Sequence, residues 1–158
     1  MNTARKEMEQ RPDNRVTQGA NRFVTFHLDA EKYGINVMQV REVLKVSEIA
    51  PVPGGPDFVL GIINLRGNVV TVIDTRQRFG LQPRDVDDAT RIVIIEEDEQ
   101  VVGMVVDSVA EVMNIPANEI EVAPNVGNDE SAKFIHGVSH QGEELIILID
   151  NAKLFAMD

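Results

Sequence analysis

Short segments that alternate between apolar and polar residues recur along the chain, and a period of two is typical of half-buried β-strands. Residues 23–29 form the first of them, and residues 33–37, 58–64 and 69–74 continue the pattern. Residues 51–56 contain three prolines and two glycines, a composition that predicts a loop without regular structure. The pattern therefore predicts an all-β protein whose strands are joined by turns and short loops.

Other segments do not alternate and predict different structures. Residues 1–22 are polar and aperiodic, and they predict a flexible N-terminal tail before a domain that covers residues 23–156. Residues 30–32 predict a turn between the first two strands. Residues 38–45 mix apolar and charged side chains and fit either a helical turn or a bent strand. Residues 82–90 predict a polar link.

The pattern then starts again, and the two copies align without gaps in two blocks. Residues 23–46 match residues 92–115, and residues 58–80 match residues 134–156. The identical pairs are Val24/Val93, Asp29/Asp98, Gly34/Gly103, Val37/Val106, Val40/Val109, Glu42/Glu111, Val43/Val112, Phe58/Phe134, Gly61/Gly137, Ile73/Ile149, Asp74/Asp150 and Phe79/Phe155. This is an internal duplication of a β unit, with one half at about 23–88 and the other at about 91–156.

Each half contains enough strands to close a small barrel, which removes exposed strand edges. Two barrels packed together bury more surface than either buries alone. The repeat leaves open whether each barrel is built from one half or whether the halves exchange strands. Positions that are identical in both halves are expected to serve folding, and positions that differ are free to serve a partner.

Composition and charge narrow the function classes. The formal net charge is −11, and there are six Phe, one Tyr and no Trp. Nucleic-acid binding relies on clustered cations and aromatic stacking platforms, so no nucleic-acid partner is expected. The chain has no cysteine, which excludes disulfides, thiolate metal sites and cysteine nucleophiles. The longest apolar run, residues 101–106, is far too short to cross a bilayer, so we expect a cytoplasmic protein without direct membrane insertion.

A search for catalytic chemistry finds no convergent site. The three histidines are His27, His136 and His140, and their positions on predicted strands do not favour a shared metal ion. No serine lies in a Gly-x-Ser-x-Gly motif, and the acidic residues 96–99 read as the solvated tip of a hairpin. Asp74 and Asp150 follow equivalent strands and are interpreted as caps. We therefore expect a binding module with no catalytic residues, no metal and no cofactor.

Four segments resemble the CheW family, whose members are coupling proteins of bacterial chemotaxis. The most specific is GIINLRGNVVTVID at residues 61–74, which contains the run Gly-x-x-Asn-Leu-Arg-Gly and ends in Asp. The others are YGINV at residues 33–37 with VREV at 40–43, VGMVVDSV at 102–109, and IILID at 146–150. The resemblance covers residues 23–156.

The resemblance implies two five-stranded barrels, similar to Src-homology-3 barrels, around a shared core with a few short helical segments. It implies a scaffold without enzyme activity that couples the cytoplasmic tip of a chemoreceptor to the regulatory domain of the histidine kinase CheA. Other CheW copies are further expected partners, in rings beneath receptor arrays at the inner face of the membrane. Because the chain has no kinase or receiver segment, it resembles a free-standing coupler.

The resemblance also implies contact residues. Those expected at the kinase are Leu60, Asn64, Arg66, Gly67 and Val69, with Glu121, Asn125 and Val126 at a second kinase or ring contact. Those expected at the receptor, near the groove between the barrels, are Val40, Glu42, Val109 and Val112. Arg66 faces Gly142 in the repeat, so the second hairpin closes without it, and we expect Arg66 to serve an interface.

Two alternatives belong to other classes. One is a non-catalytic β-barrel module that binds a small ligand or an oligonucleotide, and the negative charge and the scarcity of aromatic residues weigh against it. The other is an enzyme that uses the acidic clusters. Binding to the kinase regulatory domain separates both from the adaptor.

Overall fold

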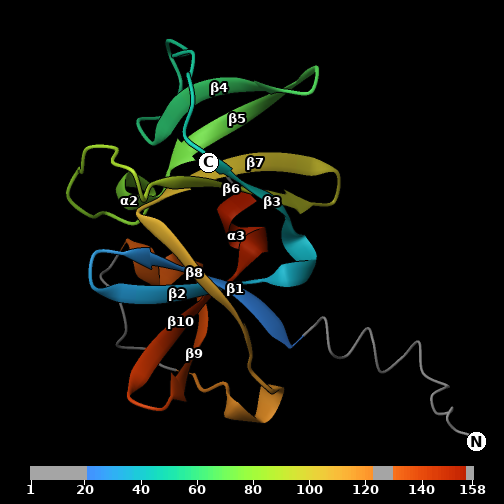
Figure 1. The fold of residues 1–158 in the computed structure, drawn as a ribbon, viewed down its shortest axis with the longest axis vertical. Helices are drawn as coiled ribbons and strands as arrows, with labels where there is room; N and C mark the ends of the chain where they lie inside the picture. Colours follow the sequence, from blue (N-terminus) through green and yellow to red (C-terminus); the bar gives the residue numbers. More distant parts are fainter. Residues whose placement is uncertain (1–20, 123–129, 156–158) are drawn as a thin grey trace, which may run out of the picture.

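The computed structural model describes residues 21–122 and 130–155 (Figure 1). The expected tail therefore lies almost wholly outside the described residues, as do Asn125 and Val126. The strands of the first half are β1 (Arg22–Leu28), β2 (Glu31–Asn36), β3 (Val40–Lys45), β4 (Val59–Leu65) and β5 (Asn68–Asp74). Those of the second half are β6 (Arg91–Glu97), β7 (Gln100–Val106), β8 (Ser108–Asn114), β9 (Ile135–Gln141) and β10 (Glu144–Ile149).

Short helical segments join some of these strands. They are η1 (Val37–Gln39), α2 (Thr75–Arg78), η2 (Ala117–Glu119), η3 (Ser131–Phe134) and α3 (Asn151–Phe155). The prediction of an all-β fold with two five-stranded units is confirmed. Residues 38–45 combine both predicted alternatives, because η1 leads directly into β3. The turn predicted at residues 30–32 was wrong: Asp29 takes a left-handed conformation with φ of 56°, so a two-residue turn suffices and β2 begins at Glu31.

The two halves exchange strands. One sheet has the order β8-β1-β2-β10-β9 and the other has the order β3-β6-β7-β5-β4. Each sheet therefore joins the first hairpin of one half to the last three strands of the other. The junctions within each sheet are equivalent: β2 runs parallel to β10 and β5 runs parallel to β7, while β1 pairs with β8 and β6 with β3. Neither half can close a sheet without the other.

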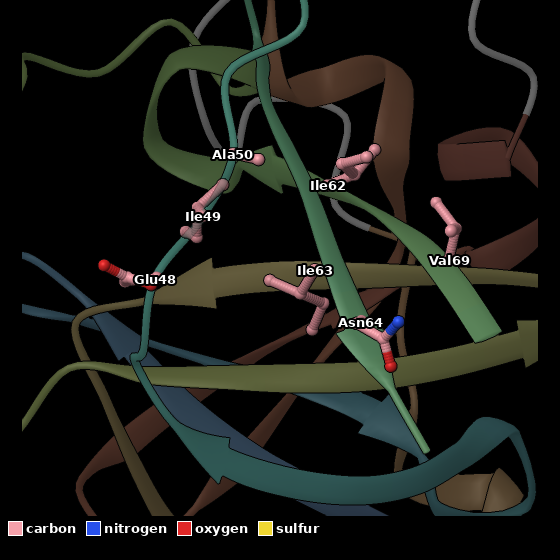
Figure 2. Close-up of a pocket in the computed structure, with 7 residues that line it drawn as sticks. All are labelled: Glu48, Ile49, Ala50, Ile62, Ile63, Asn64 and Val69. Atoms are coloured by element: carbon pink, nitrogen blue, oxygen red, sulfur yellow. The ribbon is translucent and has the colours of Figure 1, made fainter. Parts of the chain in front are cut away.

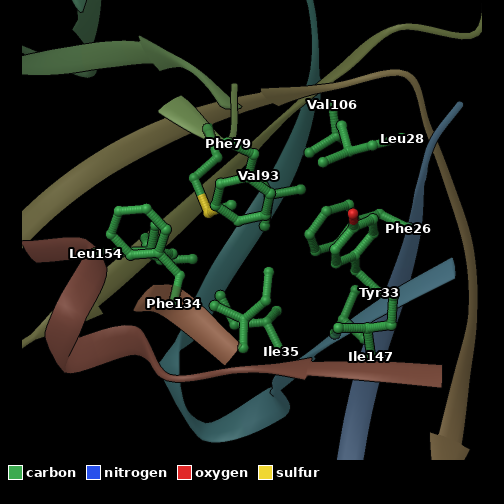
Figure 3. Close-up of a cluster of buried hydrophobic side chains, with 14 of the residues drawn as sticks. Phe26, Leu28, Tyr33, Ile35, Phe79, Val93, Val106, Phe134, Ile147 and Leu154 are labelled. Atoms are coloured by element: carbon green, nitrogen blue, oxygen red, sulfur yellow. The ribbon is translucent and has the colours of Figure 1, made fainter. Parts of the chain in front are cut away.

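The largest hydrophobic cluster draws side chains from both sheets (Figure 3). Phe26 stacks on Tyr33 with ring centroids 5.6 Å apart, and Tyr33 contacts Phe79 at 5.7 Å. Phe79 in turn stacks on Phe134 at 5.4 Å. Burial raises the pKa of Tyr33 to about 12, so its hydroxyl stays neutral. Leu154 of α3 closes the same cluster. The sheets are thus held in one unit by a shared aromatic core.

A partly buried ion-pair cluster, here called the clasp, joins the sheets at one side. It consists of Asp29, Arg76, Arg84 and Asp107. The Arg76 guanidinium lies 2.7 Å from Asp29 Oδ1 and 2.8 Å from Asp107 Oδ2, and its Nε donates to the carbonyl of Gln82. Asp107 also accepts from the Asp29 backbone N–H and from Arg84. Burial opposes the charge on Arg76, but its two carboxylate partners outweigh this and raise its pKa.

The two aspartates that recur at strand ends cap the short helices. Asp74 Oδ1 accepts from the backbone N–H of Gln77 at 3.3 Å, at the start of α2. Asp150 Oδ1 accepts from the N–H of Ala152 at 3.1 Å, at the start of α3. A side-chain acceptor at this position satisfies a helix N–H that has no partner within the helix. Their recurrence in the repeat thus has a structural cause.

Candidate partner-binding surface

The β4–β5 hairpin carries most of the residues expected to contact the kinase. Arg66 and Gly67 form its turn with φ of 50° and 87°, and Asn64 Oδ1 accepts from the N–H of Gly67 at 2.9 Å. Two successive positive φ values are the signature of a type I′ turn, which matches the twist of the strands. Asn64 and Gly67 therefore fix the turn, and Arg66 projects from its tip with 65% of its side chain exposed.

Arg66 is engaged by Glu42 of β3. Its guanidinium donates to both carboxylate oxygens of Glu42, one of them at 3.3 Å. The hydrogen bond from Arg66 lowers the pKa of the Glu42 carboxyl, and the pair raises the pKa of Arg66. The structure thus brings together a residue expected at the receptor and one expected at the kinase.

The equivalent of Glu42 in the second half, Glu111, also holds a cation. Lys32 Nζ lies 2.8 Å from Glu111 Oε2 and 3.3 Å from Glu144 Oε1. The hydrogen bond from Lys32 lowers the pKa of Glu111. An acidic residue at this strand position therefore forms an ion pair in both barrels. Glu42 thus has a structural role that was not expected from the sequence, which placed it at the receptor contact.

Beside the hairpin lies a cavity of about 490 Å³ between β4 and the segment that follows β3 (Figure 2). Ala50 pairs with Ile62 through two backbone hydrogen bonds of 2.9 Å, so this segment runs along the edge of β4. The lining residues are Glu48, Ile49, Ala50, Ile62, Ile63, Asn64 and Val69. Sequence reasoning missed Glu48, Ile49 and Ala50, because nothing in their pattern indicates pairing with a distant strand.

Gly61 is what allows this close approach. Its φ is 153°, and a Cβ at this position would lie 2.1 Å from the carbonyl oxygen of Ala50. The same arrangement recurs in the second half, where a Cβ on Gly137 would lie 2.8 Å from the carbonyl oxygen of Glu121. This pair of identical glycines thus marks where another segment pairs closely with the edge of a strand.

Two apolar residues of the β4–β5 hairpin are exposed to solvent. Val69 is 67% exposed and Leu60 is 38% exposed. Leu60 is the extra residue of a β-bulge, since Val59 and Gly61 pair with successive residues of β5. Val69 pairs with Asn64 across the hairpin. The five residues expected at the kinase therefore form one surface on β4 and β5, part apolar and part charged.

The valines expected at the receptor are not alike. Val40 and Val109 are partly buried and pack against the shared core. They occupy equivalent places, opposite Ile95 and Phe26 respectively. Val112 is 47% exposed on β8, at the edge of its sheet. Val112 is the only one of these three valines that offers substantial side-chain surface to a partner.

Of the second kinase or ring contact, the structure describes only Glu121. It is exposed, pairs with Val138 through backbone hydrogen bonds of 2.8 Å, and lies 3.8 Å from His140 Nδ1. Val122 beside it is 88% exposed. Asn125 and Val126 fall outside the described residues, so Glu121 and Val122 alone mark this surface.

Among residues 21–122 and 130–155, no three histidine or acidic side chains converge as metal ligands. His136 and His140 are both exposed on β9. Within the same residues, no helix is both long enough and apolar enough to span a membrane.

Comparison with known proteins identifies relatives over nearly the whole chain. The model of the CheW-like domain family matches residues 22–158. The chemotaxis protein CheW of Klebsiella aerogenes is 33% identical, covering 86% of this chain and 82% of the relative. The chemotaxis protein CheW of Bacillus subtilis is 34% identical, covering 82% and 83%.

A solved structure agrees with these sequence matches. The crystal structure of the scaffolding protein TtCheW from Thermoanaerobacter tengcongensis superimposes with a TM-score of 0.77 at 38% identity. The match covers 83% of this chain and 89% of the solved one. Sequence and fold thus indicate the same family.

Proposed function

The chain belongs to the CheW-like domain family, a family of chemotaxis scaffold proteins, and we propose that it couples chemoreceptors to the histidine kinase CheA. The observation that carries the proposal is the family match, which spans both barrels and includes the exposed Asn-Leu-Arg-Gly hairpin. In this role the chain binds both partners at once and has no catalytic activity of its own. It acts in the cytoplasm and is recruited to receptor arrays.

The kinase surface of this proposal is the β4–β5 hairpin with its neighbouring cavity. Exposed Leu60 and Val69 supply apolar contact area, and Arg66 supplies the N–H donors that are not bonded to Glu42 for a carboxylate or carbonyl across the interface. Arginine beside apolar side chains is typical of residues that dominate binding energy. Glu42 holds Arg66 in one orientation, which reduces the conformational entropy lost when the interface forms.

The receptor surface of this proposal lies along β8 and β3, the edge strands of the two sheets. Val112 and its equivalent Val43 are both exposed there, at 47% and 39%. A receptor tip is a helical hairpin, and helices bind by placing apolar side chains into grooves. Val40 and Val109 lie on the same two strands and pack against the core. The surface around Glu121 is assigned to other copies of the scaffold in a ring.

A binding experiment tests the proposal. The full chain is immobilised, and the kinase regulatory domain and a soluble receptor signalling fragment are each titrated onto it. We expect saturable binding of both, together as well as singly, because the two surfaces are distinct. No binding of the regulatory domain at tens of micromolar contradicts the adaptor role and favours a barrel that serves another ligand.

Arg66→Ala will weaken binding to the kinase regulatory domain and leave the stability of the fold nearly unchanged. The side chain is exposed and its turn conformation is fixed by Asn64 and Gly67, so the melting temperature should stay within about 2 °C. Affinity for the kinase regulatory domain should fall about tenfold or more. Asp74→Ala is the matched control, since losing the cap of α2 should cost about 1 kcal/mol of stability and leave binding per folded molecule unchanged. The opposite pattern, a destabilised Arg66→Ala with normal binding, assigns Arg66 to the fold.

Val112→Trp will weaken receptor binding more than kinase binding. The valine is exposed on an edge strand, so a larger side chain is tolerated by the fold but obstructs a helix that docks there. We expect at least about a fivefold loss for the receptor fragment and less than a twofold change for the kinase domain. Titrations of both partners onto the same variant provide the comparison. An equal loss of affinity for both partners would show that the receptor does not bind at β8.

A further inference from the structure

A second cavity lies where the end of β10 meets α3, η1 and the end of β6. Its volume is about 550 Å³. The polar residues that line it are Asn21, Asn36, Gln39, Glu97, His136, Asp150 and Asn151. Neither the β4–β5 hairpin nor Val112 takes part in it. It therefore stands apart from both surfaces of the proposed function.

Asn151 is the least satisfied residue of this cavity. Only 7% of it is exposed, yet neither Oδ1 nor Nδ2 has a hydrogen-bond partner among the described residues. A buried carboxamide without partners costs free energy, because it gives up hydrogen bonds to water and gains none. Glu97, across the cavity, forms no ion pair with any described residue. The site thus holds acceptor oxygens that a ligand would satisfy.

The internal repeat shows what fills the corresponding place in the other half. Ala152 lines the cavity and is equivalent to Arg76. Only 7% of Arg76 is exposed. Its guanidinium donates to Asp29, which follows β1, and to Asp107, which precedes β8. By the repeat alignment, Asp98 is equivalent to Asp29 and Met38 of η1 is equivalent to Asp107. The cavity is lined by their chain neighbours, Glu97 and Gln39. Where one half buries a guanidinium, the other has a cavity.

We propose that this cavity is a binding site for a guanidinium group supplied from outside the described fold. The group is planar and carries five N–H donors in a fixed fork, which suits several oxygen acceptors arranged around a pocket. Glu97 supplies a carboxylate, and Gln39 and Asn151 supply carbonyl oxygens. Residues 91–158, the half of the chain that supplies Glu97, Asp150 and Asn151, carry three cations and fourteen anions, so the charge of this half attracts a cation.

The first test uses methylguanidinium as the probe and the full chain as the receptor. Two-dimensional NMR titration should show saturable shifts at Gln39, Glu97 and Asn151, with a dissociation constant of about 1–10 mM. Methylammonium, which has the charge without the planar fork, should shift these signals at least about fivefold more weakly. No saturable shift at these residues up to about 50 mM overturns the proposal, and so does equal binding of methylammonium.

A second titration, with a peptide, identifies whether the guanidinium group comes from a protein or from a small molecule. A blocked Gly-Arg-Gly peptide that binds as well as methylguanidinium, or better, assigns the site to an arginine side chain of a partner protein. A peptide that fails where methylguanidinium binds assigns it to a free small molecule. Both results support a guanidinium site. Neither depends on the kinase or the receptor, so the outcome is independent of the adaptor role.

The repeat suggests the variant Ala152→Arg, which gives α3 the arginine that its equivalent position, Arg76, has in the other half. We expect the new guanidinium to occupy the cavity, to raise the melting temperature by about 2–4 °C and to abolish methylguanidinium binding. Ala152→Gln, which is long and uncharged, is the matched control and should do neither. An Ala152→Arg protein that still binds methylguanidinium with unchanged affinity overturns the assignment of this cavity.

Discussion

Gly61→Ala will destabilise the protein by about 3 kcal/mol, because the new Cβ has no space. It would lie 2.1 Å from the carbonyl oxygen of Ala50 and 2.7 Å from its carbonyl carbon. Both are backbone atoms held by the two hydrogen bonds between Ala50 and Ile62, so they cannot move aside without breaking that pairing. The φ of 153° adds backbone strain for any residue with a side chain. Urea denaturation followed by circular dichroism measures the loss.

Gly67→Ala is the matched control for Gly61→Ala. Gly67 also has a positive φ, 87°, but a Cβ there meets no atom within 4 Å. Its replacement should therefore cost only the backbone term, about 1 kcal/mol. The difference in unfolding free energy between the two variants measures what the close approach of Ala50 to β4 contributes to stability. If both variants lose the same stability, this close approach contributes nothing and Gly61 does not fix the surface beside it.

Asp107→Ala will have a similarly large effect, about 3 kcal/mol, because it removes the centre of the clasp. The carboxylate is 8% exposed and accepts from Arg76, Arg84 and the backbone N–H of Asp29. Its removal leaves the buried Arg76 charge with Asp29 as its remaining carboxylate and leaves the N–H of Asp29 without its acceptor. Because these residues come from both sheets, the junction between the barrels should loosen.

Hydrogen exchange locates this loosening, and urea denaturation measures its size. Amides of Asp29 and the residues around α2 should exchange faster in Asp107→Ala, while those of the β4–β5 hairpin stay protected. Arg84→Ala is the control: its side chain is 47% exposed, so losing its bond to the same carboxylate should cost less than about 0.5 kcal/mol. A loss below 1 kcal/mol for Asp107→Ala would show that the clasp is not what joins the sheets.

The strands and turns were largely predictable from the sequence, because they depend on local pattern. Alternation and turn residues place β1, β4 and β5 within about two residues of their observed bounds. The repeat correctly indicated equivalent elements in the two halves. The exchange of strands was not predictable, because a duplication fixes which segments resemble one another and leaves open which segments pair. The burial of Lys32 and Arg76 was missed for the same reason, since their carboxylate partners lie far away in sequence.

The idea that differences between the halves mark partner contacts holds only in part. Arg66 differs from its equivalent Gly142 and is exposed, as the idea requires. Arg76 also differs from its equivalent, Ala152, yet it is buried in the clasp and serves the fold. Glu42 is identical to Glu111, and in both halves the residue anchors a cation. Divergence in a duplicated protein therefore identifies changed environments, and burial decides whether the change serves folding or binding.

The most direct test of the account is receptor control of kinase activity in a reconstituted mixture. Autophosphorylation of CheA is measured with receptor-containing membranes, with and without the full chain, and with the Arg66→Ala variant at equal concentration. The account predicts that activity becomes dependent on the receptor's ligand only when the chain is present, and that Arg66→Ala needs about tenfold more protein for the same effect. Ligand control that is equally strong without the chain would contradict its role as the coupling scaffold.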